Sequence, residues 1–325
     1  MILVTGGAGF IGSAAVWELN RRGIEDIIIS DHLGMKEKWK NLRALKYADY
    51  IEKDDLLEDI LDDEGFYSCL DAVIHMGACS STTEKDCSYL SYNNYEYTKL
   101  LAGYCIRNNI RFIYASSAAT YGDGRNGFSD DISKLEDHRP LNMYGYSKQM
   151  FDLYAKRNKY FDRITGIKFF NVYGPNEYHK DDMSSKIFKA YGEIKNTGRI
   201  RLFKSYNDKW KDGDSVRDFV YVKDCARIIC DMIERPDISG LFNMGSGKAR
   251  SWNDLASAVF KSMDIPRSVE YFEMPDELKG KYQYFTESDN SSLEKTGIEL
   301  NFTSLEDGVN DYIKNYLVDE KHLGD

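Results

Sequence analysis

The sequence predicts an α/β protein, with a doubly wound parallel sheet followed by a smaller C-terminal lobe. Short apolar runs bounded by glycine or polar turns are typical of buried parallel strands. They lie at 2–4, 27–30, 72–75, 111–115 and 167–170. The stretches between them have helical patterns, the clearest at 11–21, 89–108 and 144–157. Because parallel strands need a crossover connection, this alternation indicates βαβ units.

The pattern changes at about residue 176, where loops rich in lysine and aspartate begin. We therefore predict a first domain over 1–175 and a second lobe over 176–325. The boundary is soft, because 219–222, 226–234 and 241–244 have the patterns of a strand, a helix and a strand. The segment 219–245 could thus return to the first sheet.

The composition is that of a globular protein and excludes several classes of function. The chain has 325 residues, 42% of them hydrophobic and 30% charged, so about two cores are expected. No apolar run approaches the ~18 residues of a membrane span and no export signal is evident, so we expect a cytoplasmic protein without a membrane partner. A net charge of −10 without lysine or arginine runs argues against nucleic-acid binding. The charge does not exclude the binding of a small anionic ligand in one cleft.

The spacings of cysteine and histidine indicate neither disulfides nor metal. The six cysteines form no Cys-x-x-Cys pair, which argues for reduced thiols. The five histidines lack the spacings of metal ligands, so we expect no metal site.

A glycine-rich turn follows the first predicted strand. Gly6, Gly9 and Gly12 connect that strand to the helix predicted at 11–21. Glycines here permit a tight turn and let the backbone approach a pyrophosphate, while the helix N-terminus holds the anion. In this strand, turn and helix context the motif predicts a dinucleotide-binding domain of the Rossmann type.

The second predicted strand ends in an acidic residue that bears on the choice of cofactor. Asp31 stands where a carboxylate bonds the ribose hydroxyls of adenosine, which by itself favours NAD. His32, Lys36, Lys38 and Lys40 follow at once, and a lysine that swings back could neutralise a 2′-phosphate. NADP therefore stays open beside NAD.

Two further motifs place a phenol, an amine and a hydroxyl at the ligand edge of the predicted sheet. Tyr144 and Lys148 are spaced i, i+4 at the start of a predicted helix, so they share one face. An ammonium beside a phenol lowers the phenol pKa from ~10 toward neutrality, which makes a general base for a sugar hydroxyl. Ser117 ends an apolar strand and could orient the same hydroxyl.

Together these motifs resemble the extended short-chain dehydrogenase/reductase family, and the resemblance covers nearly the whole chain. The segments 169–175 and 217–224 are similar to its substrate-side signatures. The resemblance implies hydride exchange at a carbinol carbon of a nucleotide-linked sugar, with Tyr144, Lys148 and Ser117 as catalytic residues. Dehydratases of this kind carry an Asp-Glu pair after the catalytic hydroxyl, whereas two alanines, at 118 and 119, follow it here. An epimerase is therefore the better interpretation.

Several dispersed segments are similar to the ADP-L-glycero-D-manno-heptose 6-epimerase family. They lie at 77–84, 93–95, 171–180 and 279–283. The resemblance implies NADP-dependent inversion at C6″ of ADP-D-glycero-D-manno-heptose through a transient carbonyl compound, in the supply of lipopolysaccharide inner-core heptose, and a homopentamer. Because the carbonyl presents two faces, its oxygen occupies two places, and one acid/base cannot easily reach both within ~3 Å. The resemblance nominates Tyr144 for one orientation and Lys180 for the other.

The same resemblance assigns the other site residues. Those expected along the cofactor are Gly6, Gly9, Phe10, Ile11, Gly12, Asp31, His32, Lys38, Lys53, Met76, Gly77, Ala78, Cys79, Ser80, Asn93, Tyr144, Lys148, Val172 and Lys180. Those expected to face the ADP-heptose are Asn171, Asp182, Lys189, Phe203, Lys204, Ser205, Tyr206, Arg217 and Tyr282. Arginine suits a diphosphate because its fork is bidentate. The acidic pair Asp181 and Asp182, next to Lys180, could raise the pKa of this lysine.

Two alternatives stay open. A UDP-hexose 4-epimerase, or another nucleotide-sugar epimerase, shares the pattern of Ser117, Tyr144 and Lys148 but needs a single base, so Lys180 discriminates. A dinucleotide-binding protein without chemistry would share the fold, since fold alone never fixes function. Such proteins usually lack the base, which this sequence has.

Overall fold

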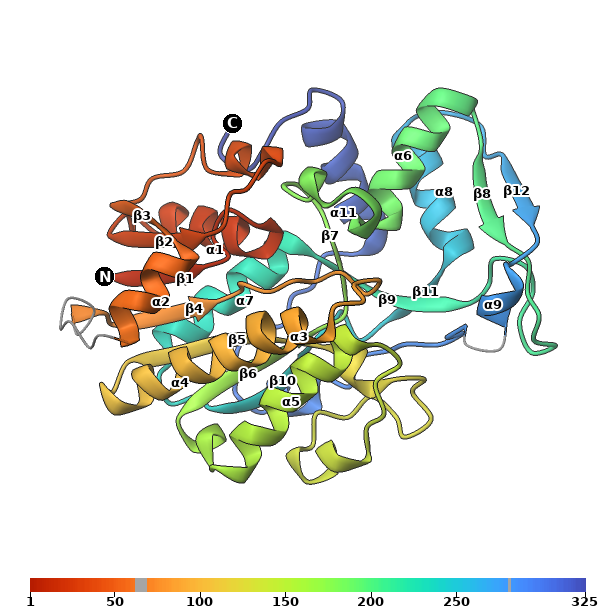
Figure 1. The fold of residues 1–325 in the computed structure, drawn as a ribbon. Coiled ribbons are helices and arrows are strands. Elements are labelled where there is room, and N and C mark those ends of the chain that lie inside the picture. The colour runs from red at the N-terminus through yellow and green to blue at the C-terminus, as the bar shows by residue number, and fades with distance from the viewer. Residues whose placement is uncertain (62–68, 280–281) are drawn as a thin grey trace.

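A parallel sheet forms the centre of the molecule, which is a computed structural model that describes residues 1–61, 69–279 and 282–325 (Figure 1). The sheet has seven strands in the order β10-β6-β5-β4-β1-β2-β3, and every neighbouring pair is parallel. The strands are β1 (Ile2–Thr5), β2 (Ile27–Asp31), β3 (Asp49–Glu52), β4 (Ala72–His75), β5 (Arg111–Ser117), β6 (Ile164–Phe169) and β10 (Gly240–Met244). The strand order reverses between β1 and β4, which is where doubly wound sheets bind their ligands.

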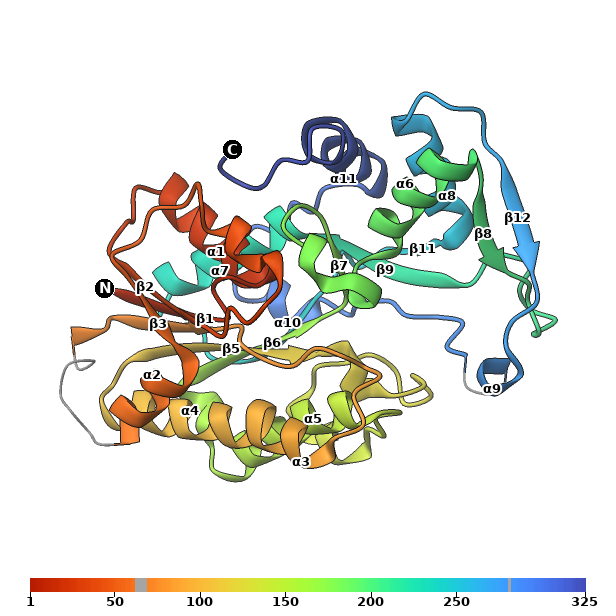
Figure 2. The same cartoon turned by 45° about the horizontal axis from the view of Figure 1, so that its top comes forward.

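Helices cover both faces of this sheet (Figure 2). On one face α1 (Phe10–Arg21) and α7 (Val222–Glu234) pack in a single apolar core with the strands. On the other, α2 (Lys53–Leu61), α4 (Tyr97–Arg107) and α5 (Met143–Arg157) form a second core. The predicted α/β class with a doubly wound sheet is therefore confirmed.

One predicted helix is divided into three pieces. The stretch 89–108 contains α3 (Cys87–Leu90), a π-helical turn over Ser91–Glu96, and α4. The turn brings Asn94 inward, where its side chain binds both backbone polar groups of Cys79 at 2.9 Å. Single π-helical turns of this kind are frequent at functional sites. The edge strand β3 was not predicted, because its partly exposed residues form no apolar run.

The second lobe contains two small sheets and a core of its own, at the right of Figure 1. One sheet joins β7 (Asn171–Tyr173), β9 (Val216–Tyr221) and β11 (Ala249–Ser251), and the other joins β8 (Ile200–Phe203) and β12 (Val269–Phe272). The longer helices of the lobe are α6 (Lys186–Thr197), α8 (Trp252–Ser262) and α11 (Leu305–Tyr312), and a short one is α9 (Asp276–Lys279). The short helix α10 (Ser291–Glu294) packs instead in the core of the main sheet, where Leu293 is buried. Within the segment 219–245, β10 lies in the main sheet beside β6, whereas β9 does not.

The C-terminal residues fold back onto the first domain, close to α1 (Figure 1). His322 Nδ1 lies 2.8 Å from Asn41 Oδ1. The amide nitrogen of Asn41 donates to the carbonyl of Ala8, in the glycine-rich turn, at 2.9 Å and to that of Asn176 at 3.0 Å. Asn41 therefore links the glycine-rich turn to the loop that follows β7.

Candidate active site

A cleft of about 990 Å³ lies at the carboxyl ends of β1, β2, β4, β5 and β6 and is covered by segments of the second lobe. Nineteen of the residues that the sequence nominated line it, namely Gly6, Gly9, Phe10, Ile11, Gly12, Asp31, His32, Lys38, Met76, Gly77, Ala78, Cys79, Ser80, Ser117, Tyr144, Lys148, Asn171, Val172 and Lys180. The cleft brings together residues from both lobes, as the sequence predicts.

The glycine-rich turn is too tight for any side chain. Gly6 has a φ of +66°, and a Cβ there would lie 2.5 Å from the amide nitrogen of Gly77. A Cβ on Gly12 would lie 2.1 Å from the carbonyl oxygen of Gly6. The turn opens α1, whose first N–H groups have no intrahelical partner and receive no side-chain cap from the N-cap Gly9. These features fit a pyrophosphate.

Asp31 organises the adenosine end of the cleft. Its Oδ2 accepts from the backbone N–H of Ala8 at 2.9 Å, and its Oδ1 accepts from Lys38 Nζ at 2.5 Å and from the N–H of His32 at 2.7 Å. Lys36 lines the cleft but pairs with Asp181, at 2.8 Å. A carboxylate and a cation therefore sit together where the ribose of a dinucleotide would bind.

The Tyr144 group differs from the sequence prediction in its electrostatics. Burial lowers the pKa of Lys148 to about 8, and the nearby charge of Asp152 opposes this effect. Burial also raises the pKa of Tyr144, while the Ser117 hydroxyl, a hydrogen-bond partner of the phenolate, lowers it. The prediction that Lys148 brings the pKa of Tyr144 toward neutrality is thus wrong for this structure, because desolvation of the phenolate dominates.

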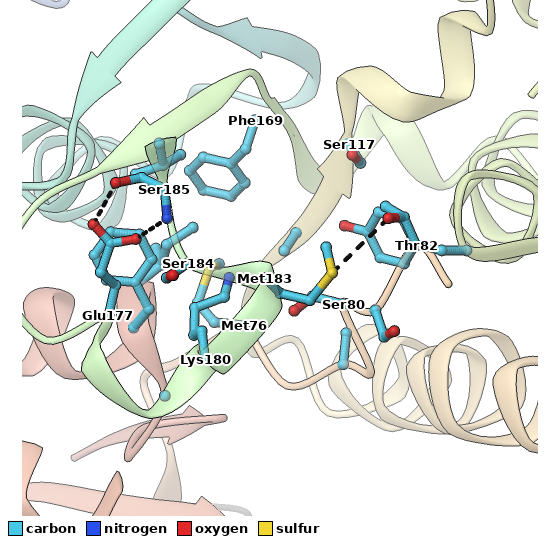
Figure 3. Close-up of a pocket in the computed structure, with 18 of the residues that line it drawn as sticks. Met76, Ser80, Thr82, Ser117, Phe169, Glu177, Lys180, Met183, Ser184 and Ser185 are labelled. Carbon is cyan, nitrogen blue, oxygen red and sulfur yellow. Dashed lines mark hydrogen bonds between the residues drawn. The ribbon is translucent and has the colours of Figure 1, made fainter. Parts of the chain in front are cut away.

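Lys180 lies at another part of the cleft, on the 3₁₀ segment Tyr178–Met183 that follows β7. Its Nζ is 5.5 Å from the centre of the Phe10 ring. Figure 3 shows Lys180 and Ser117 well apart in the cleft. Burial lowers the pKa of Lys180, and the carboxylate of Glu177 opposes the shift. A desolvated amine of this kind gives up its proton more readily than a lysine in water does.

The acidic pair beside Lys180 does not have the expected effect. Asp181 has a φ of +46°, and its carboxylate points to Lys36. Asp182 is exposed, and its backbone carbonyl accepts from Lys189 at 2.6 Å. The carboxylate that acts on the pKa of Lys180 is that of Glu177.

Ten other nominated residues do not line the cleft, and their roles stay predictions. Lys53 donates to the side-chain oxygen of Asn93 at 3.2 Å, beside the Asn94 that holds Cys79. Asp182 and Lys189 contact each other through the hydrogen bond described above. The other six belong to the second lobe: Phe203, Lys204, Ser205, Tyr206, Arg217 and Tyr282. The motif at 279–283 includes residues 280 and 281, which are outside the described residues.

Arg217 and Tyr282 form an aromatic and cationic group with Trp252, which does line the cleft. The Arg217 guanidinium lies 5.6 Å from the Trp252 ring centre and 5.4 Å from that of Tyr282. The Tyr282 hydroxyl accepts from Trp252 Nε1 at 2.9 Å, and the Phe203 ring is 6.2 Å away. Burial lowers the pKa of Arg217, and no carboxylate of the described residues forms an ion pair with it.

Comparisons with known proteins agree with this geometry. A family model described as the NAD dependent epimerase/dehydratase family matches residues 2–245. The chain belongs to this family. The ADP-L-glycero-D-manno-heptose-6-epimerase of Nitratidesulfovibrio vulgaris is 52% identical over 317 residues, which are 98% of each chain. That of Fusobacterium nucleatum is 49% identical over 98% of this chain and 99% of its own. The crystal structure of the Helicobacter pylori ADP-L-glycero-D-manno-heptose-6-epimerase superposes with a TM-score of 0.79 and 26% identity, over 97% of this chain and 95% of that one.

The predicted membership of the extended short-chain dehydrogenase/reductase family is thus confirmed. Membership of the epimerase/dehydratase family indicates a nicotinamide dinucleotide cofactor and a nucleotide-sugar substrate. None of the described helices is both long and apolar enough to cross a bilayer. No cluster of metal-ligating side chains occurs among the described residues.

Three residues of this epimerase-family site were missed by the sequence analysis. Asn94 was considered only as part of the motif at 93–95. Its place in a predicted helix that follows the glycine- and serine-rich segment 77–84 could have indicated a contact with that segment. Trp252 directly follows an N-cap serine, and nothing in its own neighbourhood points to the cleft. Glu177 is 1% exposed, and its place between Pro175 and Lys180 could have drawn attention to it.

Proposed function

We propose that this chain is an ADP-L-glycero-D-manno-heptose 6-epimerase that inverts C6″ of ADP-D-glycero-D-manno-heptose. Relatives of 41% to 52% identity over nearly the whole chain have this name. The observation that carries the proposal is a second ionisable group in the cleft: Lys180, which is desolvated and lies apart from Ser117, the hydrogen-bond partner of Tyr144.

Inversion requires two proton-transfer groups on this chain. A bound nicotinamide would supply the hydride acceptor and donor, taking hydride from C6″ and returning it. Tyr144, with Ser117 beside it, would exchange the proton of the sugar oxygen in one orientation. Lys180 would do so once the carbonyl has turned. The covering segments from the second lobe would exclude water from the transient ketone.

The group formed by Arg217, Trp252, Tyr282 and Phe203 would bind the nucleotide end of the substrate. Its arginine is partly buried and forms no ion pair with a carboxylate of the described residues, so an anionic diphosphate would provide the missing countercharge. Aromatic rings beside it offer faces on which a base can stack. The observed cleft does not extend to Arg217, and we propose that substrate binding opens it in that direction.

We propose NADP as the resident cofactor. Lys38 already lies at 2.5 Å from Asp31, and His32 and Lys36 line the same end of the cleft. A 2′-phosphate would draw Lys38 from the Asp31 carboxylate, since phosphate bears more charge. NAD would use Asp31 for its two ribose hydroxyls instead.

The test uses one sample of the purified protein. Mass spectrometry after denaturation identifies the bound nucleotide, and NMR follows ADP-D-glycero-D-manno-heptose incubated with the holoenzyme. We expect NADP and the appearance of the L-glycero epimer. A protein that epimerises UDP-glucose at C4 and leaves the heptose unchanged would instead be the UDP-hexose epimerase, for which Lys180 has no role.

Three further properties rest on the resemblance and stay predictions: a role in the supply of lipopolysaccharide inner-core heptose, a cytoplasmic location, and a homopentamer. Native mass spectrometry of the holoenzyme tests the last. A single species of any other stoichiometry would contradict it.

A further inference from the structure

One buried carboxylate closes both ends of the segment that carries Lys180. Glu177 precedes the 3₁₀ segment Tyr178–Met183, and Ser185 follows it. Glu177 Oε1 accepts from Ser185 Oγ at 2.7 Å and from the backbone N–H of Gly174 at 3.3 Å, and its Oε2 accepts from the N–H of Ser185 at 2.5 Å. Figure 3 shows these two side chains together at one end of the cleft. The segment is thus fixed to the end of β7 and to the start of α6.

The arrangement requires a carboxylate. Ser185 is the N-cap of α6, where its Oγ accepts from the N–H of Phe188 at 3.2 Å. Its hydroxyl proton is therefore free to go to Glu177, and the helix dipole favours negative charge at this point. Both Glu177 oxygens accept, so an amide at this position would direct its NH₂ group at one donor.

Glu177 is also the carboxylate that acts electrostatically on Lys180. It opposes the effect of burial on the pKa of the ammonium, whereas Asp181 is engaged with Lys36. The other titratable groups near Glu177 are Tyr178, on its own segment, and Tyr312, from α11. Burial raises the pKa of both phenols, so neither has a charge near neutrality.

We propose that Glu177 is a positioning residue that holds Lys180 in the cleft and stabilises its ammonium form. The proposal rests on the proposed function, in which Lys180 exchanges the second proton. It predicts that Glu177 acts on the reaction only through Lys180. A shape-conserving change that removes the charge should therefore alter the titration of Lys180 as well as turnover.

The experiment compares Glu177→Gln with the wild-type holoenzyme. Lys180 is titrated by brief acetic anhydride labelling at a series of pH values, with peptide mass spectrometry and the exposed Lys195 as internal reference. Loss of a nearby negative charge destabilises the ammonium, so the labelling midpoint should move to lower pH. In turnover of ADP-D-glycero-D-manno-heptose, kcat should fall at least about tenfold through misplacement of Lys180, with KM nearly unchanged.

Asp224→Asn is the matched control. Asp224 is a buried carboxylate that likewise binds a neighbouring loop. It accepts hydrogen bonds from the N–H of Thr303 at 2.8 Å and from the Thr303 hydroxyl at 3.0 Å. It lies outside the cleft, so its loss should lower thermal stability and leave the Lys180 midpoint in place. A folded Glu177→Gln protein with the wild-type midpoint would overturn the proposal.

Ser185→Ala decides the matter if Glu177→Gln does not fold. This variant keeps the charge and removes one of the three hydrogen bonds, so Lys180 should become labelled faster and kcat should fall. Wild-type values for both would overturn the proposal. A shifted Lys180 midpoint in a protein whose wild type leaves the heptose substrate unchanged would refute the proposed function and support the placement of Lys180 by Glu177.

Discussion

Lys168 and Asp152 form an ion pair, with 2.7 Å between Nζ and Oδ2, in which neither side chain is exposed. Asp152 lies on α5 and also accepts from the hydroxyls of Tyr114, at 2.8 Å, and Ser116, at 2.7 Å. These donors stabilise the negative charge of the buried Asp152 carboxylate in place of water. The pair therefore joins β6 and β5 to the helix that contains the Tyr144 motif.

The same pair reaches the backbone of Ser117 through one more residue. Lys168 donates to Thr120 Oγ1 at 2.6 Å, and that hydroxyl donates to the backbone carbonyl of Ser117 at 2.8 Å. Asp152 stands one turn after Lys148 and helps to keep it protonated. The relative positions of Ser117 and Lys148 thus depend on a salt bridge whose two residues do not line the cleft.

We predict that Lys168→Met lowers the free energy of unfolding by about 3–5 kcal/mol, because it leaves Asp152 buried and uncompensated. Urea unfolding followed by circular dichroism measures the change. The control is Lys321→Met, which removes a surface pair with Asp319 and should leave the midpoint unchanged. A loss for Lys168→Met as small as that of the control would mean that the hydroxyls of Tyr114 and Ser116 suffice for Asp152.

The rate should fall above pH 8 because of Lys148. Its ammonium has a pKa of about 8, so it is present below that pH and lost above it. Lys148 and Tyr144 both line the cleft, so loss of the ammonium removes a positive charge from the place where the proposed proton transfer occurs. We therefore expect the plot of kcat/KM against pH to have an alkaline limb, a fall that begins near pH 8. Single-turnover and steady-state rates measured over a series of pH values test this. Lys148→Arg, which stays charged, should lack this limb even though its maximal rate is lower; a limb at the same pH in both proteins would assign it to another group.

Much of the first domain could be predicted from the sequence, because its strands are buried on both faces. The run 72–75 coincides with β4, and the runs 2–4 and 27–30 miss one residue each of β1 and β2. The glycine turn and the motif of Tyr144 and Lys148 depend on local spacing, which a sequence displays directly. The cleft-lining positions of Gly6, Gly12 and Tyr144 were therefore accessible without a structure.

The remainder depends on contacts between distant segments. That Glu177 rather than Asp181 acts on Lys180 follows from the fold of one loop, where Asp181 turns toward Lys36. The raised pKa of Tyr144 comes from its burial in the folded cleft, which i, i+4 spacing does not reveal. Trp252 reaches the cleft because β11 pairs with β9, a long-range antiparallel contact.

His75 should make the protein sensitive to acid. Its ring is buried between Thr5, with Nδ1 at 2.5 Å from Oγ1, and Thr98, with Nε2 at 2.8 Å. Burial and the charge of Lys148 lower its pKa to about 3, against ~6.5 when unfolded. As pH falls through this window only the unfolded state gains the proton, so stability should fall by up to ~1.4 kcal/mol per pH unit. His75→Gln should reduce that slope in urea unfolding between pH 7 and 5; equal slopes would contradict the prediction.

Cofactor choice should depend on Lys38. If it binds the 2′-phosphate, Lys38→Ala should weaken NADP by about 10- to 100-fold, the equivalent of a hydrogen bond to a charged group. NAD affinity should hold or improve, because the variant frees Asp31. Calorimetric titration of cofactor-free protein with each dinucleotide measures both. Lys40→Ala is the control, since Lys40 pairs with Glu37 and lies outside the cleft. Equal losses for NADP and NAD would argue that Lys38 only supports the fold of the loop.

Lys180→Met tests the requirement for a second proton-transfer group. Methionine keeps the apolar stem beside Phe10 and removes the amine, so cofactor should stay bound while turnover of the heptose substrate falls by several orders of magnitude. Lys195→Met, an exposed position on α6, is the control and should turn over normally. With Tyr144 intact, the variant should still transfer hydride between cofactor and one C6″ epimer, which is measurable as transient absorbance at 340 nm or as exchange of label from a deuterated cofactor. Normal epimerisation by Lys180→Met would show that Tyr144 reaches both positions of the oxygen, and would favour a mechanism in which the whole sugar rotates.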